Sequence, residues 1–245
     1  MRQSGYYEIG EKRAQRVSDL FSSIATRYDL INDMQSGFMH RYWKSRVIWA
    51  LKPSEGESAL DICCGTGDIS ELLWNRGAQV TGLDFNSEML AIARIRAGEL
   101  ARSGMGPGGV KPDYILGDAL NLPFQDKAFD LISMSYGLRN LADFRKGLEE
   151  MARVARPGCR IAILDFGKPT NPTLREMYFN YLRLSVPVLG QIMAGDRSAY
   201  AYILESLHKY PDPDFFISIL GSLGIQARAE SFMGGVMTLI HGQKN

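Results

Sequence analysis

The stretch ALDICCGTGDIS, residues 59–70, decides the fold that this sequence predicts. A short apolar run leads to one acid, Asp61, and two glycines, Gly65 and Gly67, follow soon after it. Glycines so close together let the backbone turn sharply and let a bulky ligand approach the main chain. A strand that ends in an acid and is followed by a glycine-rich turn therefore predicts a ligand site here.

On both sides of this stretch, short β runs alternate with helical segments. We expect strands over 58–62, 79–84, 112–118, 130–137 and 159–166, and helices over 69–76, 87–102 and 144–155. Such alternation predicts an α/β fold with a Rossmann-like, doubly wound and mostly parallel sheet. Two final β runs, 225–232 and 236–242, surround a pair of glycines and predict an antiparallel strand pair at the C-terminal end of the sheet.

The segments outside this alternation are helical. Apolar residues at helical spacing predict a helix over 11–28, and an aromatic-rich stretch predicts another over 39–51. Two or three further helices follow one another within 172–223. We therefore expect a single domain, made of an N-terminal helical cap (1–53), a cofactor-binding core (54–171), a helical substrate region (172–223) and C-terminal strands (224–245).

Composition excludes several classes of protein. The chain has 28 Lys and Arg against 27 Asp and Glu, a balance that disfavours binding nucleic acid through phosphate neutralisation. No apolar run approaches the roughly 18 residues of a membrane span, and the first residues lack a signal-peptide core. The three cysteines form no CxxC pair and predict reduced thiols in a cytoplasmic protein. We expect no metal site.

The glycine turn also restricts the ligand. A dinucleotide fingerprint needs a third glycine where this chain has Ser70, and no phosphate-binding GxxxxGK[ST] occurs. An acid at the end of the strand suits a cation, and S-adenosylmethionine is positively charged at its sulfonium and amino group. Asp84, at the end of the second expected strand, is placed to accept hydrogen bonds from ribose hydroxyls, as it would be for NAD. Asp118 and Ala119 follow the third strand and are expected beside adenine.

These features predict a class I methyltransferase fold with S-adenosylmethionine as cofactor. The alternative is that the three acids only cap turns and helices, as Asp often does. The candidate cofactor-binding residues are Asp61, Gly65, Thr66, Gly67, Asp84, Phe85, Met89, Asp118, Ala119 and Ser135.

Three further segments resemble a known family, the ubiquinone/menaquinone biosynthesis C-methyltransferases, which include the demethylmenaquinone and demethylphylloquinone enzymes. They are FSSIATRYDLINDMQSGFMHRYWK (21–44), SYGLRN (135–140) and AYAYILESLHKYP (199–211). The first is similar to the signature Y-D-x-M-N…S-x3-H-x2-W, with Ile31 in place of its Met. The segments RVARPGC (153–159) and DFG (165–167) depart from the family pattern, which leaves the identity of the quinone open.

The resemblance implies transfer of a methyl group to a ring carbon of a prenylated quinol: demethylmenaquinol, demethylphylloquinol or a 2-polyprenyl-6-methoxy-benzoquinol. Such a ring carbon becomes nucleophilic when a quinol hydroxyl, with a pKa of about 10, is ionised. Arg139 is our first catalytic candidate, as an electrostatic partner of the phenolate; the alternative is a structural arginine bridging a carboxylate. Tyr28 and His40 are the other candidates, on an N-terminal segment that we expect to cover the site.

The prenyl tail of such a substrate suggests two further expectations. The apolar segment 178–193 is either ordinary core, a tunnel for the tail, or a homodimer contact. A lipid substrate also implies loose, reversible association with a membrane surface. Two other functions stay open: a methyltransferase of another small phenolic or lipid substrate, and a non-catalytic scaffold that binds S-adenosylmethionine within a quinone-biosynthesis complex.

Overall fold

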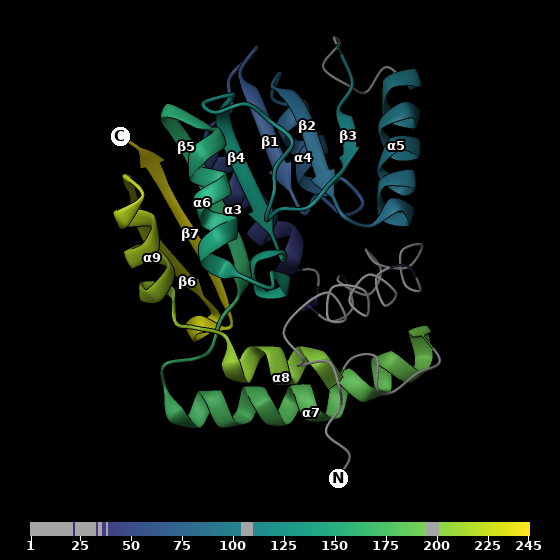
Figure 1. Ribbon diagram of the computed structural model, residues 1–245. Coiled ribbons are helices and arrows are strands. Elements are labelled where there is room, and N and C mark those ends of the chain that lie inside the picture. The colour runs from purple at the N-terminus through teal and green to yellow at the C-terminus, as the bar shows by residue number, and fades with distance from the viewer. Residues whose placement is uncertain (1–21, 23–32, 34–35, 38, 104–109, 195–200) are drawn as a thin grey trace.

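The computed structural model describes residues 22, 33, 36–37, 39–103, 110–194 and 201–245 (Figure 1). The described helices are α3 (Met39–Leu51), α4 (Asp68–Trp74), α5 (Ser87–Arg102), α6 (Phe144–Val154), α7 (Pro172–Ala194), α8 (Ala201–Lys209) and α9 (Pro213–Ser222). The described strands are β1 (Ser58–Ile62), β2 (Gln79–Asp84), β3 (Asp113–Leu116), β4 (Phe129–Ser135), β5 (Ala155–Phe166), β6 (Ile225–Phe232) and β7 (Met237–Lys244).

The seven strands form one sheet in the order β3-β2-β1-β4-β5-β7-β6. Strands β1 to β5 pair in parallel, while β7 runs antiparallel to both of its neighbours, β5 and β6. The predicted fold class is therefore confirmed. The chain leaves β1 in one direction to β2 and β3, and in the other to β4. The junction of β1 and β4 is thus the switch point at which open α/β sheets bind ligands.

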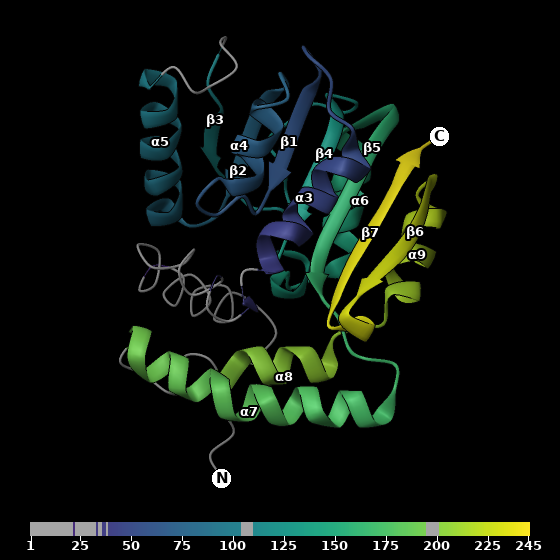
Figure 2. The ribbon, with the colours of Figure 1, turned by 180° about the vertical axis from the view of Figure 1, so that it is seen from behind.

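Alternation along the strands gives the sheet two buried faces. Leu60 and Ile62 of β1 face a cluster that includes α6 and α9, whereas Ala59 faces a cluster that includes α3 and α4. Figure 1 shows α6 and α9 in front of the sheet, and Figure 2 shows α3 in front from the other side. The core is therefore a three-layer sandwich whose five parallel strands all end at one shared edge.

Helices α7 and α8 lie apart from these layers. They pack side by side beyond the carboxyl ends of the parallel strands, as both views show (Figures 1 and 2). Helix α9 then returns to the sheet and packs on β6, β7 and α6. Of the described helices within 172–223, α7 and α8 are therefore the ones placed over the ligand-binding edge.

Side-chain caps and strand pairing fix the element bounds. The Asn86 side chain accepts a hydrogen bond from the Met89 N–H and begins α5 at the predicted residue. The predicted helix over 144–155 ends one residue early, because Ala155 takes an extended conformation and pairs with Phe129. Strand β5 therefore begins before residue 159, and its register shifts between Phe129 and Leu131.

Candidate active site

The turn after β1 has the conformation that its glycines permit. Gly65 and Gly67 have φ angles of 54° and 88°, in the left-handed region that disfavours side chains. A Cβ atom at Gly67 would lie 2.5 Å from the Tyr114 hydroxyl oxygen, so this position also needs glycine for space. Helix α4 starts immediately afterwards at Asp68. The turn brings backbone N–H groups to the carboxyl edge of the sheet.

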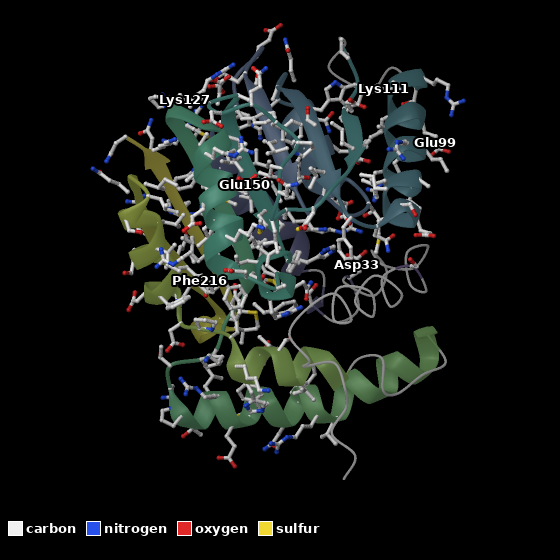
Figure 3. All side chains as sticks on the ribbon, in the orientation of Figure 1. Asp33, Glu99, Lys111, Lys127, Glu150 and Phe216 are labelled. Carbon is white, nitrogen blue, oxygen red and sulfur yellow. The ribbon has the colours of Figure 1, made fainter. Side chains whose placement is uncertain are left out.

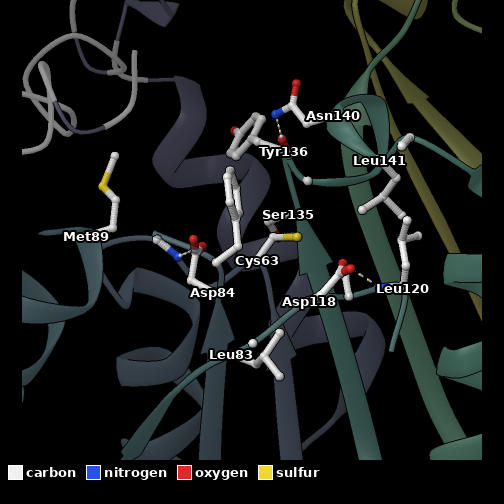
Figure 4. Close-up of a pocket in the computed structure, with 16 residues that line it drawn as sticks. Cys63, Leu83, Asp84, Met89, Asp118, Leu120, Ser135, Tyr136, Asn140 and Leu141 are labelled. Carbon is white, nitrogen blue, oxygen red and sulfur yellow. Dashed lines mark hydrogen bonds between the residues drawn. The ribbon is translucent and has the colours of Figure 1, made fainter. Parts of the chain in front are cut away.

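A cavity of about 310 Å³ opens at this edge. Figure 4 shows its lining, with Asp84 and Asp118 at the strand ends and Tyr136 and Asn140 on the loop after β4. Most of its wall is apolar. The predicted cofactor residues that line it are Gly65, Asp84, Phe85, Met89, Asp118, Ala119 and Ser135.

Asp84 is held rigidly at the end of β2. Its Oδ2 accepts a hydrogen bond from the Gly65 N–H at 2.8 Å, and its Oδ1 accepts one from the Asn86 N–H at 3.0 Å. Each carboxylate oxygen can accept a second hydrogen bond, so the side chain retains capacity for a pair of ligand hydroxyls. Burial raises the pKa of Asp84 above its usual value.

The Ser135 hydroxyl provides a second sign of a polar ligand. It lines the cavity, is buried, and has no hydrogen-bond partner among the described residues. A buried hydroxyl without a partner is costly, and a ligand that bonds to it removes that cost. Acidic acceptors, a hydroxyl and apolar walls together fit a nucleoside that carries a cation.

Asp61, Thr66 and Gly67 do not line this cavity. Asp61 accepts hydrogen bonds from the hydroxyls of Ser70 at 2.7 Å and Ser133 at 2.8 Å, and only 1% of it is exposed. It therefore ties β1 to α4 and β4. Burial raises its pKa to about 6.

A second cavity, of about 380 Å³, adjoins the first. Its wall includes the rings of Trp43, Tyr136, Phe166 and Tyr178, together with His40. Tyr136 lines both cavities, so they share this residue as part of their walls. Its φ of 60° is unusual for a residue with a large side chain, and hydrogen bonds from the Tyr136 N–H to Leu164 and from Asn140 to the Tyr136 carbonyl hold it.

Arg139 lines neither of these two cavities. The residue is 4% exposed, its backbone N–H donates to Asp165 Oδ2 at 2.9 Å, and its Nη1 lies 3.9 Å from Asp165 Oδ1. The guanidinium stacks 4.7 Å from the ring of Phe166, which does line the second cavity. Arg139 therefore lies beside a buried carboxylate, as the alternative of a structural arginine requires. The ring of Phe166 lies between the guanidinium and the second cavity.

The N-terminal candidates have different outcomes. Tyr28 lies outside the described residues. His40 lines the second cavity, and its Nε2 lies 2.7 Å from Asp33 Oδ1. Sequence reasoning missed Asp33 and Tyr136. Asp33 lies seven residues before His40, inside the quoted segment 21–44, but a turn at Gly37 separates it from the helix that holds His40, so helical spacing gave no signal for the pair. Tyr136 lies inside the quoted segment SYGLRN.

The topology and the acid-bearing cavity at its switch point define a class I, S-adenosylmethionine-dependent methyltransferase. Among solved structures, a SAM-dependent methyltransferase from Aquifex aeolicus has a similar fold, with a TM-score of 0.54 and 19% identity over 82% of this chain and 89% of that one. The chain belongs to the ubiE/COQ5 methyltransferase family, whose model matches residues 9–244. The family resemblance and the predicted cofactor are thereby confirmed.

Two relatives match nearly the whole chain. A protein of Roseobacter denitrificans, named ubiquinone/menaquinone biosynthesis C-methyltransferase, is 38% identical over 96% of this chain and 92% of its own length. A demethylmenaquinone methyltransferase of Desulfitobacterium hafniense is 37% identical over 96% of this chain and 92% of its own length.

Proposed function

We propose that this enzyme methylates an aromatic ring carbon of a prenylated quinol. The observation that carries the proposal is the pair of cavities that meet at Tyr136, one with acidic acceptors and the other apolar and aromatic. The names of the two relatives support the same reaction. The first cavity takes the cofactor, and the second takes the flat ring of the quinol.

In the first cavity, Asp84 is proposed to accept hydrogen bonds from the ribose hydroxyls, and Asp118 and Ala119 to lie at the adenine. Ser135 is proposed to bond a polar group of the same ligand. S-adenosylmethionine, when bound, supplies a methyl group that is electrophilic because its sulfur is positively charged. Phe85 and Met89 keep water from the ligand, which strengthens every electrostatic interaction inside the cavity.

In the second cavity, aromatic rings hold the quinol ring in one plane, and alignment of the reacting atoms supplies much of the rate enhancement. The positive charge of Arg139 is proposed to favour the phenolate form of the quinol through the ring of Phe166. The nearby Asp165 carboxyl offsets part of the positive charge of Arg139, so the size of the effect on the phenolate depends on how much of that charge Asp165 neutralises. Tyr28 is still proposed to lie on the N-terminal segment that covers the site.

Product analysis tests this function. The enzyme is incubated with S-adenosylmethionine and either a demethylnaphthoquinol or a 2-prenyl-6-methoxy-benzoquinol of short prenyl tail, and the products are identified by mass spectrometry. A ring C-methyl product supports the proposal. Cofactor binding by calorimetry without a product from either quinol would favour the scaffold, and methylation of simple phenols alone would favour another small substrate.

The enzyme is also proposed to collect its substrate at a membrane surface. Helix α7 exposes Met177, Tyr181 and Leu184, with exposed fractions of 64%, 50% and 75%. Their spacing places them on one face of the helix. Tyr181 also lines the second cavity, so this face continues into the proposed quinol site. Within the described part of the chain, no helix is long and apolar enough to cross a membrane.

A further inference from the structure

His40 and Asp33 form a buried pair at the second cavity. His40 is 4% exposed and Asp33 8%, and His40 Nε2 lies 2.7 Å from Asp33 Oδ1. Figure 3 shows Asp33 near the carboxyl edge of the sheet, on the side that faces α7 and α8. Arg41 fixes Asp33 further, because its Nε and Nη2 donate to the two carboxylate oxygens at 3.0 Å and 2.8 Å.

This arrangement selects one form of the imidazole. Hydrogen bonding from Arg41 holds the pKa of Asp33 down at about 2, so Asp33 is a carboxylate that can only accept. Nε2 of His40 must then carry the hydrogen. Burial, and then the positive charge of Lys44, lowers the pKa of His40, so the ring is neutral at neutral pH. The neutral ring has its lone pair on Nδ1.

Nδ1 is the atom left for chemistry. It is buried and has no hydrogen-bond partner among the described residues, while His40 lines the second cavity. The charged groups that act on the ring are Asp33, Lys44 on the same helix as His40, and Asp68 at the start of α4, while Arg41 is paired with Asp33. The other groups of this cavity that can ionise are tyrosines: Tyr136, Tyr178 and Tyr181. An acceptor of this kind suits the hydroxyl of a ligand.

We propose that His40 Nδ1 is the general base that removes the hydroxyl proton of the quinol, and that Asp33 is the positioning residue that fixes its tautomer. This inference rests on the proposed function and names the base of that same site. The quinol O–H bond breaks, an N–H bond forms at Nδ1, and the electron pair stays on oxygen, which raises the electron density of the ring carbon.

The remaining protons balance. Once the ring carbon has gained its methyl group, it loses its own proton to water and the ring becomes aromatic again. The imidazolium returns its proton to the quinol oxygen, so each turnover releases one proton to solvent and regenerates His40. Arg139 is unsuited to this role, because a guanidinium stays protonated in proteins.

Kinetics of His40→Gln and Asp33→Asn test the proposal, with His241→Gln as the control because His241 lies on β7 and outside both cavities. General base catalysis contributes about 10²–10⁴ in rate, so His40→Gln should lose about that much in kcat. Affinity for S-adenosylhomocysteine should stay unchanged. The deficit should shrink as the pH approaches the quinol pKa of about 10, where the substrate ionises unaided.

The pH profile separates a base from a structural histidine. The wild-type rate should fall as His40 becomes protonated, below a pKa that lies under 6.5. Asp33 raises the pKa of His40, so Asp33→Asn should move this acidic limb to lower pH and also lower the maximum rate. A merely structural Asp33 would leave the limb in place. Normal turnover by folded His40→Gln, or an unmoved limb in Asp33→Asn, overturns the proposal.

A probe that needs no methyl transfer distinguishes this proposal from the reaction itself. The absorption of bound para-nitrophenol reports its ionisation, and wild type should ionise a larger fraction of it than His40→Gln at the same pH. If wild type ionises para-nitrophenol more than His40→Gln does but yields no quinol product, His40 is still supported as a base and the proposed methylation reaction is contradicted. Equal ionisation by both proteins would contradict the proposal that His40 is the general base.

Discussion

The Asp84 carboxylate links the turn after β1 to the end of β2 through its hydrogen bonds with Gly65 and Asn86. We expect Asp84→Ala to weaken binding of S-adenosylhomocysteine about 10- to 100-fold, because a hydrogen bond to a charged group contributes about 1.5–3 kcal/mol. Calorimetry on the folded variant measures this. Asp113→Ala, at the opposite end of β3, is the control, and equal affinities in the three proteins would remove Asp84 from the cofactor site.

Replacing Arg139 should affect both the stability of the protein and the rate of methylation. Removing one partner of a buried pair costs about 3–5 kcal/mol, so Arg139→Ala should lower the free energy of unfolding by about that amount. Asp165→Asn in the same chain should recover part of it, because no unpaired charge then remains buried. If the guanidinium also acts on the phenolate, Arg139→Ala should lower the methylation rate by about 10²–10³ at a temperature where it is folded. Unchanged turnover there excludes the electrostatic role.

At the residue scale, sequence could predict which residues reach the carboxyl edge, but not where each side chain points. Asp84 and Asp118 line the first cavity, whereas Asp61 bonds to Ser70 and Ser133 instead. Those hydroxyls come from α4 and β4, and only the packed sheet brings them to Asp61. Asp33 depends in the same way on Arg41 and His40, which take its two oxygens.

At the scale of elements, the turn between β1 and α4 offers a matched pair of substitutions. A methyl group at Gly65 meets no atom within 4 Å, while one at Gly67 lies 2.5 Å from the Tyr114 hydroxyl. Both pay the strain of a left-handed conformation, about 1–2 kcal/mol. We expect Gly67→Ala to be the more destabilising in urea unfolding. Gly65 lines the cavity, so Gly65→Ala should chiefly weaken cofactor binding; the reverse ranking would contradict this geometry.

The exposed face of α7 gives a second prediction at this scale. Leu184→Glu should reduce flotation with anionic lipid vesicles and slow methylation of a quinol embedded in them, because a charge on an apolar docking face is costly to bury. Turnover of a short-tailed, detergent-dispersed quinol should be unchanged. As the control, Gln79→Glu adds the same charge at an exposed position at the start of β2, at the opposite edge of the sheet. A loss of dimer mass in light scattering, with flotation unaffected, would assign the face to a second copy instead.

Local patterns predicted most of the elements. Residues 58–62, 79–84, 87–102 and 225–232 have the predicted bounds, because caps and turn residues mark both ends. Strand β5 was predicted too short, since its first residues pair across a register shift that only the partner strand creates. The packing of α9 on the sheet, away from α7 and α8, likewise depends on tertiary contacts.

At the scale of the whole molecule, buried carboxylates make stability depend on pH. Burial raises the pKa of Asp61 from 3.8 to about 6, so its contribution to the free energy of unfolding is fully present below the unfolded value and is lost as the pH rises through about 6. Asp84 and Asp165 change in the same direction. Asp33 and Asp68 have lowered pKa values, and their contributions are lost as the pH falls below the usual range.

We therefore expect the ligand-free protein to be most stable near pH 4 and to lose stability as the pH rises from about 4 to about 6. For Asp61 the rise in pKa corresponds to about 3 kcal/mol. Asp61→Asn cannot ionise, so its stability relative to wild type should improve between pH 4 and pH 7. Urea unfolding midpoints at the two pH values measure the change, and a difference that does not vary with pH would contradict the burial of an ionisable Asp61.

The position of the first cavity at the junction of β1 and β4 has a consequence for folding kinetics. Strands β1, β2 and β3 are neighbours in sequence, but Asp61 and Ser133, which join β1 to β4, are 72 residues apart. Bringing distant segments together costs loop entropy before any contact compensates it. When only β1, β2 and β3 have paired, Asp84 is in place but Ser135 and Tyr136 are not yet opposite it. A nucleoside that contacts both parts of the sheet therefore binds only the native state, so it slows unfolding and leaves the refolding rate nearly unchanged.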